Sequence, residues 1–325
     1  MPRKVILDVD TGSDDAVAII TALLAPELEV LGICSVNGNR EVRLTTENTL
    51  RVVELLGADV PVYQGCEFPL VSTLLPWRRP EIPIREGELK GTISKVHGDY
   101  LPFPPATRKP EDKSAVVYLI ETLLASDGDI TLVPVGPLTN IAAAMRADPR
   151  IIPKIKEIMI MGAGYCVNNK TPMAEYNFWV DPEAAEIVLQ CGRPITLVPL
   201  DATHQAYLTV EDAARMRTIG NKAADAVAAL IEQRTSGYDD DADMHEYKGA
   251  PIHDALAVCA LLDESVLKDV REVNAHVDIS GGFADGQTCI DMRQTVLKDK
   301  PNCRIALGAD RHKFADILVD VLRHG

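Results

Sequence analysis

Four aspartates lie within eight residues near the N-terminus of the chain. They are Asp8, Asp10, Asp14 and Asp15. Ionised carboxylates this close together repel one another, so either some of them take up protons or a cation lies among them. Ca²⁺ takes about six to eight oxygen ligands in proteins, which suits a site built from carboxylates. The cluster therefore indicates a site for a divalent cation.

The sequence around the cluster predicts a strand followed by a helix. Apolar residues alternate along 4–10, which places Asp8 and Asp10 on one face of a strand. A Thr-Gly-Ser turn and an apolar run over 15–25 predict the helix. Asp14 or Asp15 alone also fits a helix N-cap, where acidic side chains are favoured. Capping does not explain Asp8 and Asp10, which end an apolar strand where a solvent-facing charge has no structural purpose.

Apolar runs and helical patterns alternate through most of the chain. We expect strands at 4–10, 28–36, 130–135, 155–161 and 195–199, and helices near 15–25, 41–56, 113–125, 138–147 and 182–190. This order predicts an α/β fold with a mostly parallel open sheet and helices on both faces. Further strands are expected within 270–307, and a last helix at 310–323.

Two segments interrupt this alternation. Residues 66–112 are rich in proline and lack a periodic pattern, which predicts a loop insertion. Residues 209–262 are expected to be mainly helical and to lie near the functional site. Neither segment has the composition of a linker between domains, so we predict a single domain over residues 1–325.

The composition of the chain excludes some kinds of partner. The 325 residues carry 48 acidic against 33 basic side chains, a formal net charge of −15. Such a surface repels phosphate backbones, so no nucleic-acid polymer is expected as a partner. No apolar stretch approaches the ~20 residues of a membrane span, so no membrane partner is expected either. The seven cysteines are scattered without a C-x-x-C pair, which favours reduced thiols and a cytoplasmic location.

Polar residues recur where the predicted strands end. Asp10 closes the first strand, Asn37 and Asn39 follow the second, and Val135 closes the third. The fourth strand leads into a long loop, 161–185, that is rich in Asn, Glu and Tyr. In open α/β sheets, ligands bind outside the carboxyl ends of the strands. Amides and carboxylates there suit a polyhydroxylated ligand, although Asn and Gly are also common in ordinary loops.

A second acidic turn lies far along the chain, in the sequence GAPIHDALAVCALL. His253 and Asp254 precede an apolar helix there, as Asp14 and Asp15 do near the N-terminus. An isolated histidine at a helix start is more often structural. Beside a carboxylate that could complete the cation site, His253 is instead a candidate proton donor.

These residues carry a resemblance to a known family. Over nearly its whole length, the chain resembles the nucleoside hydrolases of the inosine–uridine-preferring type. The matching segments are DVDTGSDDAVAI (8–19), NGN (37–39), TLVPVGPLTNIA (131–142), MGAGY (161–165), NNKTPMAEYNFWVDPEAA (168–185), PLDATHQ (199–205) and PIHDALAV (251–258). The resemblance implies a doubly wound α/β fold, one Ca²⁺ per subunit, a small-molecule ribonucleoside as substrate, and a homo-oligomer, either a tetramer or a dimer.

The resemblance also implies a cation site and a reaction. The main-chain carbonyl of Val135 and the carboxylates of Asp10, Asp15 and Asp254 would hold the ion. The reaction would be hydrolysis of the N-glycosidic bond of a ribonucleoside to ribose and free base. Because coordination to Ca²⁺ alone should not yield abundant hydroxide at neutral pH, a base must help to activate water. We assign Asp10 as that catalytic base and His253 as the proton donor to the base that leaves.

The same resemblance implies a ribose site. Met161 would lie under the sugar ring, while Tyr176 and His253 would lie near the base. The ribose hydroxyls would meet five polar side chains, which are Asp14, Asn39, Asn169, Glu175 and Asn177. Asp8 is expected to support its neighbours, and His204 to be structural.

The choice between purine and pyrimidine bases stays open. Many members of the family carry a His-Gly-x-x-Gly loop, which reads HGDYL at 97–101 here. The segment 238–249 could also set base selectivity through Tyr238, His245 and Tyr247. One alternative is a pyrimidine-specific hydrolase acting on cytidine and uridine. Others are a nucleoside phosphorylase, a Mg²⁺-dependent phosphotransferase with Asp8 as nucleophile, and a non-catalytic nucleoside-binding protein.

Overall fold

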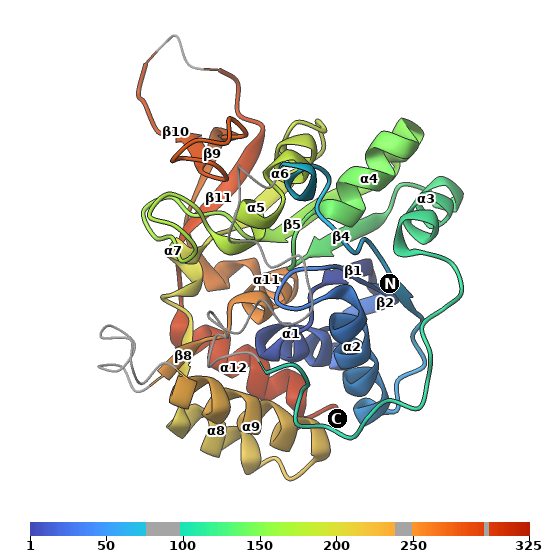
Figure 1. The fold of residues 1–325 in the computed structure, drawn as a ribbon. Helices are drawn as coiled ribbons and strands as arrows, with labels where there is room; N and C mark the ends of the chain where they lie inside the picture. Colours follow the sequence, from blue (N-terminus) through green and yellow to red (C-terminus); the bar gives the residue numbers. More distant parts are fainter. Residues whose placement is uncertain (76–97, 238–248, 296–298) are drawn as a thin grey trace.

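A nine-stranded sheet forms the centre of the protein, in a computed structural model that describes residues 1–75, 98–237, 249–295 and 299–325 (Figure 1). Its strands are β1 (Arg3–Val9), β2 (Leu28–Ser35), β3 (Val62–Gln64), β4 (Ile130–Pro134), β5 (Ile155–Met161), β6 (Ile195–Val198), β9 (Leu267–Val277), β10 (Thr288–Asp291) and β11 (Cys303–Ala309). They lie in the order β10-β9-β11-β6-β5-β4-β1-β2-β3. Pairing is parallel from β11 across to β3, and antiparallel where β9 and β10 form one edge. The predicted mostly parallel sheet is confirmed.

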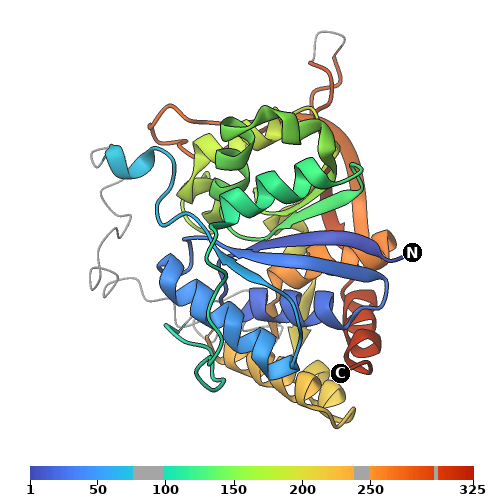
Figure 2. The same cartoon turned by 90° about the vertical axis from the view of Figure 1, so that its right-hand side faces the viewer.

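Helices cover both faces of this sheet (Figures 1 and 2). One layer contains α3 (Ala115–Ala125), α4 (Thr139–Ala147) and α6 (Pro182–Leu189). The other layer contains α1 (Ser13–Leu24), α2 (Val42–Leu56), α8 (Val210–Arg217), α9 (Lys222–Gly237), α11 (His253–Leu262) and α12 (Arg311–Leu322). Two short helices, α5 (Tyr176–Val180) and α7 (Leu200–Thr203), lie in the chain that follows β5 and β6. The predicted covering of both faces is confirmed.

Strand β1 shows why the sheet has two apolar faces. Val5, Leu7 and Val9 are buried in the core on the α1 side, whereas Ile6 belongs to the core on the α4 side. Asp8 shares the face of Ile6, because successive side chains of a strand point to opposite faces. The strand lies between β4 and β2, where the strand order reverses. Ligand sites of open α/β sheets lie at such a switch point.

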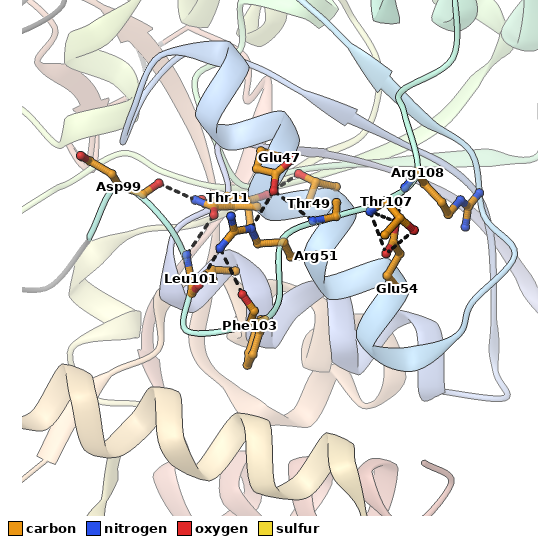
Figure 3. A network of polar contacts seen from close by, with 12 residues as sticks. Thr11, Glu47, Thr49, Arg51, Glu54, Asp99, Leu101, Phe103, Thr107 and Arg108 are labelled. Carbon is orange, nitrogen blue, oxygen red and sulfur yellow. Dashed lines mark hydrogen bonds and ion pairs between the residues drawn. The ribbon is translucent and has the colours of Figure 1, made fainter.

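The stretch 98–112 runs along α2 and is held by side chains of that helix (Figure 3). Arg51 Nη1 donates a hydrogen bond to the carbonyl of Phe103 at 3.1 Å. Glu54 Oε1 accepts one from the backbone N–H of Thr107 at 2.8 Å. These bonds fix an irregular segment because they satisfy backbone polar groups outside the helices and strands.

Before residue 200, each helix and strand that the sequence predicts begins and ends within two residues of its bounds in the structure. The sequence does not predict β3, nor the pair β7 (Tyr207–Thr209) and β8 (Gly249–Pro251), which form a separate antiparallel ladder. Each of these strands has three residues, which is too short for a periodic pattern. In the ranges that the structure covers, no helix is both long and apolar enough to cross a membrane.

Candidate active site

The N-terminus of α1 places two of the predicted aspartates. The helix begins after Gly12, and Asp15 Oδ2 accepts a hydrogen bond from Gly12 N at 2.8 Å. Asp15 Oδ1 accepts one from Asp10 N at 3.1 Å, which ties the helix to the end of β1. The N-cap residue is Gly12, so neither Asp14 nor Asp15 takes the N-cap position that the structural alternative predicts; Asp15 stands at N3 and binds the N-cap backbone. Asp15 Oδ2 also accepts a hydrogen bond from Asn39 Nδ2 at 3.4 Å, whereas the second lone pair of Oδ1 can face a cation.

A third carboxylate of this cluster comes from the other end of the chain. Helix α1 packs against α11 (Figure 1), and Asp254 lies in the first turn of α11. One carboxylate oxygen from each of Asp14, Asp15 and Asp254 lies within 4.8 Å of the others. All three side chains are buried, and both helix N-termini favour negative charge at this place. The arrangement could hold a metal ion.

Asp10 lies beside this cluster, just beyond the end of β1. Its Oδ2 accepts a hydrogen bond from the backbone N–H of Asn39 at 2.6 Å. Two glycines leave the space that the carboxylate occupies. A Cβ at Gly38 would lie 2.1 Å from Asp10 Oδ2, and a Cβ at Gly136 would lie 2.9 Å from Asp10 Oδ1. The loops after β2 and β4 therefore close around Asp10 at distances that only glycine allows.

The charges of these aspartates repel one another. Burial, followed by the charge of Asp15, raises the pKa of Asp10 well above its usual value. Burial and the charge of Asp14 raise the pKa of Asp15 to about 6. Burial and the other three aspartates also raise the pKa of Asp254. A divalent cation would offset this repulsion, and a set of oxygen donors suits a hard ion.

A buried arginine that the sequence analysis missed contacts the cluster. Arg234, near the end of α9, is 1% exposed and donates from Nη1 to Asp14 Oδ1 and to Ser13 Oγ, both at 2.9 Å. Its Nε donates to the carbonyl of Pro251 at 3.1 Å. The sequence contained a sign of this burial, because Arg234 follows Ile231 by three residues and so lies on the same, buried stripe of α9. Arg234 links the first turn of α1 to β8.

Asp8 lies on the α4 face of β1 and supports the strand ends, whereas Asp10 lies beyond Val9, the last residue of the strand, so the predicted shared strand face was wrong. Asn140 Nδ2 donates to Asp8 Oδ1 at 3.2 Å and to the carbonyl of Ser35 at 3.0 Å. The side-chain oxygen of Asn140 accepts a hydrogen bond from Cys66 N at 2.7 Å. Asn140, in the first turn of α4, thus joins β1, β2 and the chain after β3. The buried Asp8 Oδ2 has no hydrogen-bond partner among the residues described.

Three further predicted residues meet at one side-chain amide. Asn177 Nδ2 donates to the carbonyl of Val135, just after β4, at 2.8 Å. The same nitrogen lies 3.3 Å from the carbonyl of Met161, at the end of β5. Val135 precedes Gly136, which abuts Asp10. The ends of β4 and β5 are therefore joined beside the acidic cluster.

Glu175 is buried at the N-terminus of α5 and is held by backbone groups. It accepts hydrogen bonds from the N–H groups of Ala163, Asn177 and Phe178 at 3.0, 2.8 and 3.1 Å. Ala163 has a φ of 73°, a left-handed conformation that costs a residue other than glycine about 1–2 kcal/mol. The backbone is thus strained where it meets Glu175. Burial raises the pKa of Glu175 to about 7 despite these three donors.

Replacing Glu175 by glutamine is expected to make the free energy of unfolding depend less on pH. The pKa of about 7 in the folded protein exceeds the usual 4.5. The stability that this group contributes is therefore complete below pH 4.5 and is lost as the pH rises through 7, by up to ~3 kcal/mol. Urea unfolding at pH 5 and pH 8 measures the loss, which should be smaller in Glu175→Gln. An equal loss in both proteins would contradict the prediction.

Tyr176 joins the loop after β5 to the loop after β2, and Asn169 holds the backbone of Tyr176. Asn169 Oδ1 accepts a hydrogen bond from Tyr176 N at 2.9 Å. The Tyr176 hydroxyl donates to the carbonyl of Gly38 at 2.7 Å, next to Asn39. Tyr176, predicted to lie near the base, therefore borders the loop that closes around Asp10, and Asn169 binds the backbone of Tyr176.

His253 is buried in the first turn of α11, next to Asp254. Its Nδ1 lies 2.7 Å from Thr203 Oγ1, at the end of α7. The rings of His204 and His253 lie 5.5 Å apart between centroids. The candidate proton donor is thus adjacent to the acidic cluster and in contact with the DATHQ segment.

Four of the residues considered for base selectivity lie outside the described part of the chain. They are His97, Tyr238, His245 and Tyr247. From the HGDYL segment, Asp99 Oδ1 accepts a hydrogen bond from Arg40 Nε at 2.9 Å. Arg40 Nη1 donates in turn to the carbonyl of Asn39 at 2.7 Å. This segment therefore reaches the Asn39 loop.

The chain is similar to known proteins over nearly its whole length. The family model described as inosine-uridine preferring nucleoside hydrolase matches residues 5–316. The chain is 37% identical over 325 residues to the pyrimidine-specific ribonucleoside hydrolase RihB of Escherichia coli (strain SE11), covering 99% of this chain and 97% of that protein.

Solved structures show the same likeness. A plant nucleoside hydrolase, the PpNRh1 enzyme, superposes with a TM-score of 0.87 at 32% identity and 99% coverage of both chains. A purine-preferring ribonucleoside hydrolase from Gardnerella vaginalis superposes with a TM-score of 0.85 at 29% identity, covering 99% of this chain and 100% of that one. The chain therefore belongs to the inosine-uridine preferring nucleoside hydrolase family and is a hydrolase.

Proposed function

We propose that this hydrolase cleaves pyrimidine ribonucleosides, uridine and cytidine, to ribose and the free base. The observation that carries the proposal is its similarity to the pyrimidine-specific enzyme of Escherichia coli, at 37% identity over almost the whole of both chains. Its identity to the purine-preferring enzyme of Gardnerella vaginalis is lower, at 29%. The similarity favours the pyrimidine-specific alternative over a hydrolase without base preference.

The buried carboxylates support a Ca²⁺ site in this enzyme. Asp10, Asp15 and Asp254 would hold the ion together with the carbonyl of Val135. The approach of Asp15 and Asp254 to within 4.8 Å of each other supports two of these ligands, and the burial and repulsion that raise the pKa of Asp10 support the third. When bound, the ion would supply positive charge beside the ribose hydroxyls.

Polar side chains around the cluster would bind the sugar. Hydrogen bonds to backbone groups hold three of these side chains in place, those of Glu175, Asn177 and Tyr176. Met161 would lie under the ring, and Tyr176 near the base. The residues proposed to bind the ribose hydroxyls are Asp14, Asn39, Asn169, Glu175 and Asn177.

Asp10 and His253 would carry the proton transfers. As the bond between C1′ and the base nitrogen breaks, its electron pair leaves with the base, and His253 donates a proton to the base. Water attacks C1′, and Asp10 accepts the proton that the water loses. Hydroxyl contacts that tighten as the sugar ring flattens lower the barrier, because they are stronger in the transition state than in the ground state.

A panel of nucleosides tests the proposed specificity. Uridine, cytidine, inosine and adenosine are incubated with the protein, and ribose is measured as reducing sugar, with and without phosphate. We expect kcat/KM for uridine and cytidine to exceed that for inosine by at least about tenfold. Faster release of ribose from inosine would contradict pyrimidine specificity. Ribose release that requires phosphate would indicate phosphorolysis.

We also propose that the enzyme is a cytoplasmic homo-oligomer, either a tetramer or a dimer. Both assignments rest on the resemblance to the family and on the reduced cysteines expected from the sequence. Light scattering coupled to size-exclusion chromatography measures the assembly, and a mass of 35.4 kDa, that of one chain, would contradict it.

A further inference from the structure

The Thr203 hydroxyl contacts the imidazole of the proposed proton donor. Thr203 Oγ1 lies 2.7 Å from His253 Nδ1, in a place where the threonine is fully buried and the histidine 7% exposed. Thr203 ends α7, a short helix that follows β6 directly. Its backbone N–H donates to the carbonyl of Pro199 at 3.0 Å. The hydroxyl is therefore held by regular structure, next to His204, which the sequence analysis expected to be structural.

The hydrogen bond at Nδ1 has a consequence for the other ring nitrogen. In a histidine, the hydrogen bond made by one ring nitrogen determines which nitrogen exchanges protons. A hydroxyl oxygen has two lone pairs and can accept a hydrogen bond from Nδ1–H. It can do so whether Nε2 carries a proton or has lost it, so the ring need not turn between the two states.

We propose that Thr203 is a positioning residue that holds His253 with its proton on Nδ1 bonded to Oγ1, so that Nε2 delivers the proton to the leaving base. The inference rests on the proposed function, in which His253 protonates that base. The N-glycosidic electron pair goes to the base nitrogen, which receives the proton from His253 Nε2. Water supplies the hydroxyl group of ribose, and its proton goes to Asp10. The imidazole is left neutral, with Nδ1–H still bonded to Thr203.

Three variants separate this role from simple packing. Thr203→Val keeps the shape of the side chain and removes the hydroxyl. Thr203→Ser keeps the hydroxyl and removes the methyl group. Thr21→Val is the matched control, because Thr21 is also buried and its hydroxyl donates a local bond to the carbonyl of Val17 within α1, at 2.7 Å.

Kinetics on two kinds of substrate test the proposal. Uridine needs a proton on its leaving base, whereas p-nitrophenyl β-ribofuranoside releases a stable phenolate without one. Thr203→Val should lower kcat for uridine by about 10- to 100-fold, part of the ~10²–10⁴-fold that general acid catalysis supplies. KM and the kcat for the p-nitrophenyl riboside should change less than about twofold. Thr203→Ser should restore most of the activity on uridine, and Thr21→Val should keep it.

Two kinetic results would overturn the proposal. One is a Thr203→Val protein with the kcat of the wild type for uridine. The other is an equal loss on both substrates, which would mean that Thr203 acts on the site as a whole and not through protonation of the base.

Nuclear magnetic resonance gives a readout that does not depend on turnover. In protein labelled with ¹⁵N-histidine, the His253 ring should carry its proton on Nδ1 in the wild type and in Thr203→Ser. The Nδ1 signal should change in Thr203→Val, and His253→Gln identifies it by removing it. A ring protonated only on Nε2 in the wild type would also overturn the inference.

The same variants distinguish failure of the inference from failure of the proposed function. If His253→Gln hydrolyses uridine normally, His253 is not the acid, and the proposed function is wrong on that point. If His253→Gln is impaired on uridine and Thr203→Val is not, only the role of Thr203 is wrong.

Discussion

Replacing Asp10 by asparagine is expected to lower kcat for uridine by about 10²- to 10⁴-fold while the protein remains folded. The range is what a positioned general base contributes, and an amide cannot accept the proton of the attacking water. The structure gives a reason for the fold to persist. Asn39 N can still donate to the side-chain oxygen, and the neutral amide removes a buried charge that the neighbouring aspartates repel.

Steady-state kinetics and thermal unfolding of Asp10→Asn measure both parts of this expectation. Asp181→Asn is the matched control, because Asp181 is also a buried aspartate and accepts hydrogen bonds from Leu70 N and Thr139 Oγ1, both at 2.8 Å. It caps α6 and lies outside the proposed catalytic residues. Turnover by Asp10→Asn close to that of the wild type would rule out Asp10 as the base.

Removal of Ca²⁺ is expected to abolish uridine hydrolysis and to lower the melting temperature. The proposed ligands Asp10, Asp15 and Asp254 are buried together, and each has its pKa raised by burial and by neighbouring carboxylates. Binding of an ion to the folded protein alone stabilises it by about 4 kcal/mol at a free concentration 1,000 times Kd. Refilling with Ca²⁺ should restore both activity and stability.

Dialysis against a Ca²⁺ chelator, followed by titration with Ca²⁺ or Mg²⁺, measures this effect. Metal content, uridine hydrolysis and thermal unfolding are followed on the same samples. Ca²⁺ should be the more effective ion, because Mg²⁺ demands a near-ideal octahedron and gives up its waters reluctantly. Activity and melting temperature that do not respond to chelation would contradict the cation site.

The sequence predicts those helices and strands that carry a long pattern of apolar residues. The apolar alternation in β1 and the continuous apolar runs of β4 and β5 predict central strands, because strands covered on both faces need apolar side chains throughout. Strands β3, β7 and β8 have three residues each and are made by tertiary pairing. A pattern that short does not distinguish a strand from a loop.

The contacts of the site are likewise of two kinds, between residues close in the sequence and between residues far apart in it. Asp15 follows Asp10 closely in the sequence, and their hydrogen bond is local. Arg234 lies 220 residues from Asp14, and an arginine on a buried stripe differs from an exposed one only through its partners. Thr203 lies 50 residues from His253, so its contact depends on how α7 and α11 meet. Residue types indicate the chemistry, but contacts between distant segments require the folded chain.

The pairing of the α1 and α11 turns has a consequence for how the enzyme is made. Asp14 and Asp254 are separated by 240 positions (254 minus 14), so a ribosome that adds ~5–20 residues per second reaches the second turn about 12–48 s after the first. A nascent chain that stops before Asp254 lacks one of the proposed ligands. Under the proposed site, tight calcium uptake therefore requires a chain that extends past Asp254 and in which the two turns have packed together.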